Sequence, residues 1–220
     1  MKTLRSRVAT FAAAAVVAGS TALIGAPAST AAVSTAGGGT PVTLPVTGEA
    51  FLAKRNTTLH LPAGAKMVGT LAPDLTVTGE LTIPETTAKM RILNIPKIGD
   101  TTSTVRIVGT APTITKIDAK NGLAMTVTNK FRIELPRVSS DLLPKLNIVL
   151  PTCRTKEITA TMTGYFKLSG PSAISGTFDI PAFEKCGYSI FGLPSARDLL
   201  LTELISGPNN TMNLQVGPLS

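Results

Sequence analysis

Apolar and polar residues alternate in several short runs, and this pattern constrains the fold more than any other feature of the chain. In residues 75–83 the apolar side chains fall on one face of an extended strand, and Thr or Glu falls on the other. Residues 123–128, 130–135 and 158–162 follow the same pattern. A period of two that recurs over many short runs is typical of antiparallel strands with one face in water.

An aliphatic residue followed by proline recurs along the chain. The pairs are Leu44-Pro45, Leu61-Pro62, Ile83-Pro84, Ile95-Pro96, Leu135-Pro136, Leu150-Pro151, Ile180-Pro181 and Leu193-Pro194. Proline donates no hydrogen bond to a strand ladder and pushes its predecessor toward extended geometry, so we predict that each pair ends a strand. Regularly interrupted strands with little helix predict an all-β fold, an antiparallel β-sandwich or a barrel-like sheet.

One short helix is predicted near the C-terminus. Ser195 is suited to cap it, and Asp198 at the third helical position favours the helix dipole. Gly207 and Pro208 end the run. We expect this helix to cover an end of the sheet, and a partner-binding helix is the alternative.

A weak internal similarity raises the question of two related halves. Residues 79–84 resemble residues 176–181, and each segment is followed by a second aliphatic-proline unit. Duplication of a β unit would explain the similarity. Chance is the alternative, because such a short motif is easily met in a β chain that is rich in Thr and Pro.

The first residues have the order of a secretory signal peptide. Lys2, Arg5 and Arg7 give a basic start, an apolar run spans residues 8–24, and small residues follow over 26–32. The apolar run is interrupted by Gly, Ser and Thr, whereas a membrane helix needs about 20 apolar residues. We therefore predict a secreted, extracellular protein with no transmembrane segment in the mature chain.

These features divide the chain into three parts. We predict a signal peptide over 1–32, a flexible N-terminal segment over 33–40 and a β domain over 41–220, with a candidate subdivision near 137–152. Cleavage after Ala32 and cleavage after Ala28 both fit the small-residue pattern, and we prefer Ala32.

The charge pattern argues against nucleic acid as a partner. The formal net charge is +8, but the basic residues are scattered, aromatic residues make up 4% of the chain and Trp is absent. Nucleic-acid-binding proteins usually concentrate basic residues on one face and place aromatic side chains among them. We predict no nucleic-acid partner, and cell-envelope components or an apolar ligand are the candidate partners.

No combination of residues points to catalysis. His60 is the only histidine, and it alternates with Leu59 and Leu61, so we expect it to point out of a strand into solvent. Asp74, Glu80 and Glu85 are close in sequence, but nothing indicates that they converge on a cleft. We therefore predict no catalytic residue, no cofactor and no metal site.

The chain has two cysteines, Cys153 and Cys186. In an exported chain such a pair favours a disulfide over two free thiols or a metal site. With His60 as the only histidine, the pair could complete a four-ligand zinc site only if carboxylates joined it.

From Cys153 onward the chain resembles a group of uncharacterised small secreted proteins of actinobacteria. The shared motifs are Gly-x-Phe-x-Ile-Pro-x-Phe-x-x-Cys-Gly over 176–187 and Gly-Pro-x-Asn-Thr over 207–211, with Cys153 as the second cysteine. The resemblance is strong in the last third of the chain and loose elsewhere. It implies export, a disulfide and a β fold, and it implies no activity.

Three functions are compatible with these observations. The leading hypothesis is a non-enzymatic exported β protein that acts by surface contacts at the cell envelope or outside the cell. The alternative is a carrier of an apolar ligand such as a lipid, because 43% of the residues are hydrophobic and the runs 90–95 and 146–150 lack alternation. The third is a hydrolase that uses His60 or a carboxylate pair in a cleft.

Overall fold

The computed structural model describes residues 39–91, 100–189 and 193–218. The predicted signal peptide over 1–32, its cleavage sites and most of the predicted flexible segment lie outside the described residues, as does the Ile95-Pro96 pair. Residues Gly37–Ser220 belong to one compact unit.

Antiparallel strands make up most of the described chain. They are β1 (Thr40–Leu52), β2 (Thr57–His60), β3 (Lys66–Leu71), β4 (Thr76–Thr82), β5 (Thr86–Arg91), β6 (Asp100–Gly109), β7 (Thr113–Asp118), β8 (Ala124–Ser140), β9 (Arg154–Thr155), β10 (Ile158–Tyr165), β11 (Ser172–Ile180), β12 (Phe183–Glu184) and β13 (Gly207–Val216). The helices are the short 3-10 helix η1 (Ala53–Arg55) and the α-helix α1 (Ala196–Ile205). The all-β prediction with one short C-terminal helix is confirmed.

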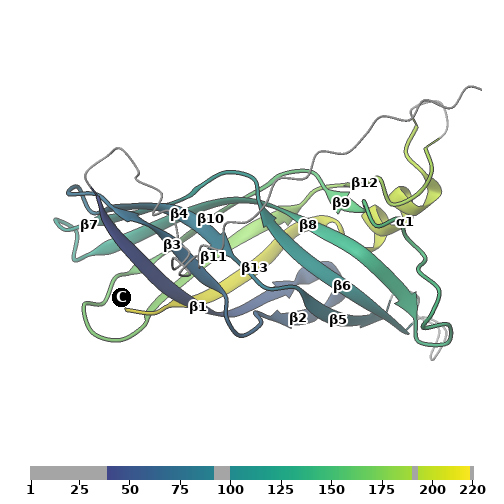
Figure 1. Cartoon of the computed structure of the whole chain (residues 1–220), viewed down its shortest axis with the longest axis horizontal. Helices are drawn as coiled ribbons and strands as arrows, with labels where there is room; N and C mark the ends of the chain where they lie inside the picture. The colour runs from purple at the N-terminus through teal and green to yellow at the C-terminus, as the bar shows by residue number, and fades with distance from the viewer. Residues whose placement is uncertain (1–38, 92–99, 190–192, 219–220) are drawn as a thin grey trace, which may run out of the picture. The chain divides into compact units, whose positions relative to one another are not determined.

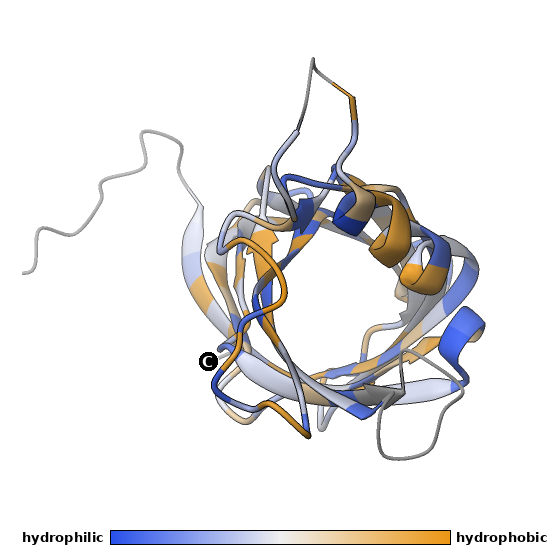
Figure 2. Ribbon diagram, turned by 90° about the vertical axis from the view of Figure 1, so that its right-hand side faces the viewer, coloured by the Kyte–Doolittle hydropathy of each residue, from blue (hydrophilic) through white to orange (hydrophobic). Residues whose placement is uncertain are grey.

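The sheet closes on itself (Figures 1 and 2). Neighbouring strands follow the order β10-β11-β13-β1-β3-β4-β7-β8, and β8 pairs back with β10. This closure depends on the length of β8, because residues 124–131 pair with β10 and residues 131–140 pair with β6. We call these mutually paired strands the ring. The ring is irregular because β6 and β5 continue the sheet beyond it.

The two ends of the ring are built from different segments. The loops 72–75, 119–123 and 166–171 join consecutive strands at one end, which we call the turn rim. At the opposite end β11 finishes and β13 begins, and β9, β12 and α1 lie there (Figure 1). We call this end the helix rim; Figure 2 looks into the ring from this side.

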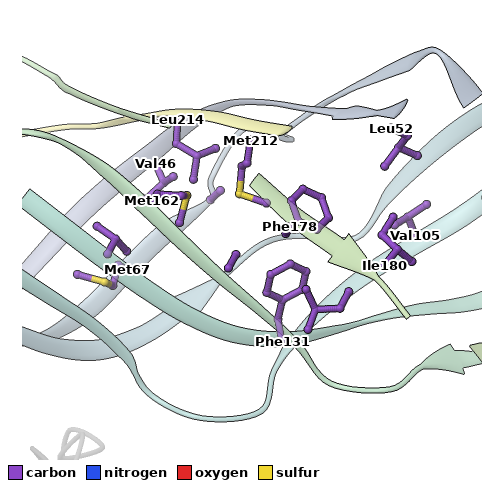
Figure 3. Close-up of a cluster of buried hydrophobic side chains, with 14 of the residues drawn as sticks. Val46, Leu52, Met67, Val105, Phe131, Met162, Phe178, Ile180, Met212 and Leu214 are labelled. Atoms are coloured by element: carbon purple, nitrogen blue, oxygen red, sulfur yellow. The ribbon is translucent and has the colours of Figure 1, made fainter. Parts of the chain in front are cut away.

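Alternation along each strand decides which side chains face the interior. In β8, Met125, Val127 and Phe131 are buried, whereas Thr126 and Lys130 are exposed. The same period of two holds along β7, β10 and β13. Figure 3 shows inward side chains of several strands packing toward one another, and the predicted inward faces are confirmed.

Three of the described proline pairs follow the prediction. Leu61-Pro62 and Ile83-Pro84 come directly after β2 and β4, and β11 ends at the Ile of Ile180-Pro181. Leu150-Pro151 and Leu193-Pro194 follow no named strand, so the prediction is wrong for them.

Two proline pairs lie inside long strands, and there the prediction is also wrong. Pro45 lies where β1 changes from pairing with β3 to pairing with β13. The last β1–β13 pair is Val46 with Val216, so the ladder with β13 needs no N–H from Pro45. Pro136 lies in a bulge of β8, where two residues between Glu134 and Arg137 oppose a single residue of β6. Strand edges and bulges are the places where a missing donor does least harm.

The predicted helix start is confirmed in detail. The Ser195 side chain accepts a hydrogen bond from Asp198 N at 3.1 Å, and the Asp198 carboxylate accepts one from Ser195 N at 2.7 Å. This reciprocal capping box satisfies two donors that a helix start leaves free. Leu201 and Ile205 are buried, and α1 packs against β12 and η1 at the helix rim.

The predicted disulfide is also confirmed. Cys153 is bonded to Cys186, and both residues are fully buried. The bond joins the segment before β9 to the segment after β12. Asp198 Oδ1 accepts a hydrogen bond from Cys186 N at 2.7 Å, so the helix start is tied to the disulfide.

Candidate apolar cavity

The residues considered for catalysis do not come together. His60 lies at the end of β2 with a side chain that is 78% exposed, and its Nδ1 is 3.4 Å from an oxygen of Glu49. Asp74 accepts a hydrogen bond from Thr76 N in a turn, and Glu80 is exposed on β4. Glu85 pairs with Arg106 instead. His60 and Glu49 lie on an open groove of about 780 Å³, whereas Asp74, Glu80 and Glu85 do not line it, so the carboxylates named from the sequence do not join His60.

The described residues also give no sign of a metal centre or a membrane helix. No three or more His, Cys, Asp or Glu side chains among them are grouped so that they could hold a metal ion. None of the described helices has the length and apolar character needed to span a bilayer.

A cavity of about 170 Å³ lies inside the ring. Every ring strand contributes inward side chains to its wall, and almost all of them are aliphatic or Met. The wall residues from the strands include Leu44 and Val46 of β1, Met67 of β3, Val77 and Leu81 of β4, Ile117 of β7, Met125 and Val127 of β8, Met162 of β10, Ile174 of β11, and Leu214 and Val216 of β13.

The cavity reaches the surface at the turn rim. Leu75, Leu123 and Phe166 of the rim loops line it and are partly buried. Leu168 also lines it but is 83% exposed. Phe166 N donates to Leu123 O at 2.9 Å, which ties two of these loops together. Leu168 therefore marks the mouth of the cavity.

Two smaller apolar spaces continue from the cavity toward the helix rim. The first, about 50 Å³, shares Leu81, Asn129 and Leu214 with the large cavity. The second, also about 50 Å³, shares Phe131 and Met212 with the first. Phe131, which lines both smaller spaces, packs edge-on against Phe178 in the wall of the second, with ring centroids 6.0 Å apart (Figure 3). Val105 and Ile107 of β6 and Ile205 of α1 also line the second space, so the row of apolar spaces extends beyond the ring.

Three polar side chains interrupt the apolar wall of the large cavity. Thr113 and Thr115 of β7 and Asn129 of β8 face inward and are buried. Thr113 Oγ1 donates a hydrogen bond to Asn129 Oδ1 at 3.1 Å. Among the described residues, no charged side chain lines this cavity.

Glu157, on the outer surface, has a lowered pKa. Hydrogen bonds from Thr110 and Lys130 to the Glu157 carboxylate hold the pKa of this group below its usual range. Glu157 directly precedes β10, at the helix rim, so it lies at the opposite end from the cavity mouth.

Of the two runs that favour a carrier, residues 146–150 form no named strand and do not line the large cavity. The other run, 90–95, lies mostly outside the described part of the chain. The wall comes instead from the alternating strands. One feature of the sequence does indicate the polar part of the wall. Asn129 falls on the same inward face of its strand as Met125, Val127 and Phe131, so a polar side chain interrupts an apolar row.

In comparisons with known proteins, no protein-family model matches the chain, and neither does any curated protein or any solved structure. The geometry of the cavity is therefore the basis for inferring the function.

Proposed function

We propose that this protein is exported and binds an apolar ligand, such as a lipid chain, inside the ring, and that it does so without catalysis. The observation that carries the proposal is the apolar cavity of about 170 Å³ that opens at the turn rim. An apolar cavity of about 150 Å³ is enough to stay dry and bind benzene. The space therefore suits a hydrocarbon group.

The dimensions favour a narrow ligand. Pockets for drug-sized molecules usually measure about 300–1,000 Å³, and the large cavity is below this range. Because the two smaller spaces follow it in a row, a linear chain uses the available volume better than a bulky ring system. Each CH₂ group that moves from water into such a site contributes about 0.8 kcal/mol.

The cavity also favours a carrier over a protein that acts by surface contacts. An unfilled apolar cavity lowers stability, because its lining loses packing contacts. A protein that acts through its outer face gains nothing from this cost, whereas a carrier needs the space. Action by surface contacts at the cell envelope remains a prediction from the sequence.

A variant that fills the cavity tests the proposal. Val127 lines the cavity, and its neighbour Thr126 on the same strand is exposed. Val127→Phe should abolish ligand uptake, and Thr126→Phe is the matched control because it adds the same ring to the outer face. Native mass spectrometry of the purified chain after equilibration with 1-decanol measures the uptake.

Uptake by the wild type and by Thr126→Phe, but not by Val127→Phe, is the expected result. Organic extraction of the protein as purified from its expression host then identifies any resident ligand. Absence of uptake by the wild type, or equal uptake by Val127→Phe, overturns the proposal.

A further inference from the structure

We propose that Asn129 and Thr113 form a polar anchor inside the cavity, and that the ligand is an uncharged lipid with a carbonyl or hydroxyl group between two apolar segments. This inference rests on the proposed function, because it assigns the chemical class of the ligand to the same cavity. It is carried by the position, the burial and the incomplete hydrogen bonding of the Asn129 carboxamide.

Asn129 is buried at a point where polar side chains are unusual. It is 4% exposed, it faces inward from β8, and it lines both the large cavity and the adjoining smaller space. Thr113, 2% exposed, lies on the neighbouring strand β7 and lines the large cavity too. Apart from Thr115, the wall residues around the pair are apolar.

The hydrogen bonds of the pair are incomplete. A carboxamide carries two N–H donors and an acceptor oxygen. Within the described residues, the bond from Thr113 Oγ1 to Asn129 Oδ1 at 3.1 Å is the one that this side chain makes. Its nitrogen therefore has no hydrogen-bond partner among the described residues, and the residue lines the cavity. Exchanging the nitrogen and oxygen of the amide would still leave one polar atom facing the cavity.

The free donor can be given a partner by a ligand acceptor. Ser103 Oγ is the fully buried side-chain polar atom without a partner among the described residues, so the unpartnered Asn129 nitrogen is not sealed but borders open space. A carbonyl or hydroxyl oxygen of a ligand in the cavity would accept from the Asn129 nitrogen. Apolar sites commonly use a few such groups to fix the orientation of the ligand.

The wall indicates that this ligand group is neutral. No Lys, Arg or His is found among the described residues that line the large cavity. His60 lines the adjoining smaller space, but its side chain is 78% exposed and lies 3.4 Å from an oxygen of Glu49. Burying a carboxylate or a phosphate without a counter-charge costs far more than burying a neutral polar group. A ketone, an ester or an alcohol fits the wall, whereas a fatty-acid anion does not.

The location of the pair also indicates where the polar group lies along the ligand. Asn129 borders the cavity of about 170 Å³ on one side and the space of about 50 Å³ on the other. A ligand bound to it would extend a long apolar arm toward the turn rim and a short arm toward the helix rim. The polar group is therefore internal and off-centre.

The test compares decane, 3-decanone and decanoate as probes on the full mature chain. We expect 3-decanone to bind about tenfold more tightly than decane, because a net hydrogen bond of about 1 kcal/mol or slightly more corresponds to that factor. Decanoate at neutral pH should bind more weakly than 3-decanone. Native mass spectrometry competition measures all three affinities.

The double variant Asn129→Leu/Thr113→Val removes the anchor and keeps the number of side-chain heavy atoms at both positions. Replacing both partners together leaves no orphaned polar group, which keeps the effect on folding small. It should bind decane at least as well as the wild type and lose the preference for 3-decanone. Thr126→Leu, an outward change on β8, is the control and should keep the preference. Thr113→Ser retains the hydroxyl and should keep it as well.

The outcomes separate the two proposals. If the wild type binds neither decane nor 3-decanone, the proposed function fails, and the anchor with it. If it binds both equally, or if the double variant keeps the preference for the ketone, the anchor is overturned and the apolar cavity stands. Tighter binding of decanoate than of 3-decanone overturns the assignment of an uncharged ligand.

Discussion

At the helix rim, Cys153 is bonded to Cys186 and Asp198 ties the start of α1 to the same segment, and these groups are buried. At the turn rim, the loops close the ring around a cavity of about 170 Å³, and Leu168 is 83% exposed at its mouth. One rim is cross-linked and densely hydrogen-bonded, whereas the other is incompletely filled.

The difference shows how a closed sheet can contain an empty space. A cavity destabilises the fold, because its lining loses packing contacts. The covalent bond and the capped helix at the helix rim stabilise the fold at the opposite end from the cavity mouth. Every ring strand lines the cavity, so the cavity is part of the same sheet that the helix rim stabilises. The disulfide and Asp198 do not line the cavity.

Removing the disulfide should have the largest effect on stability. Cys153 and Cys186 are separated by 33 positions, and closing a loop of this size stabilises by roughly 3–4 kcal/mol. Cys153→Ala/Cys186→Ala should lower the free energy of unfolding by about this amount, measured by urea denaturation. Uptake of 1-decanol by the folded variant should be unchanged, because neither cysteine lines the cavity. Loss of uptake under folding conditions would break the separation of the two rims.

Asp198→Ala should have the second largest effect. It leaves Cys186 N and Ser195 N without the carboxylate that accepts from them, at 2.7 Å in each case. We expect a loss of about 2–3 kcal/mol, because orphaned buried donors cost about 1–3 kcal/mol each and part of this is recovered by relaxation. The control is Glu203→Ala on the same helix, whose side chain is 84% exposed and should contribute less than about 1 kcal/mol. Equal effects of the two variants would contradict this account.

Leu168→Ser should affect binding and leave stability almost unchanged. The side chain is 83% exposed, so its replacement should change the free energy of unfolding by at most about 0.5 kcal/mol. Uptake of 1-decanol should become weaker, because Leu168 lines the mouth of the cavity. The control is Leu142→Ser, which changes an exposed Leu in the loop after β8 and should leave uptake intact. A similar effect of both variants would show that Leu168 has no special role at the mouth.

Glu157→Gln should have the smallest effect, and this effect depends on pH. Hydrogen bonds from Thr110 and Lys130 lower the pKa of Glu157, so the ionised carboxylate stabilises the folded state above the usual Glu pKa of about 4.3. This contribution is lost as the pH falls through the lowered pKa of the folded state. The variant should therefore be slightly less stable than the wild type at pH 7, and the difference should vanish in acid. Thermal unfolding from pH 7 to pH 3 measures it, and a difference that grows in acid would contradict the sign.

Much of the local structure could be predicted because it depends on neighbouring residues. The alternation in β4, β8 and β10 identified the strands and their inward faces. Ser195 and Asp198 predicted the helix start, since a capping box needs residues only three positions apart. The proline prediction failed at Pro45 and Pro136, because a bulge and a change of partner depend on distant strands.

By itself, the sequence determined the strand periods, the inward faces, the helix cap and the two cysteines that pair. Only the tertiary structure decided that β8 reaches β10 to close the ring, and that Thr113 and Asn129 meet on its inner wall. Pairings between strands far apart in the chain depend on the whole sheet at once. The cavity is the volume that the inward side chains leave unfilled after the ring closes, so no single run of residues encodes it.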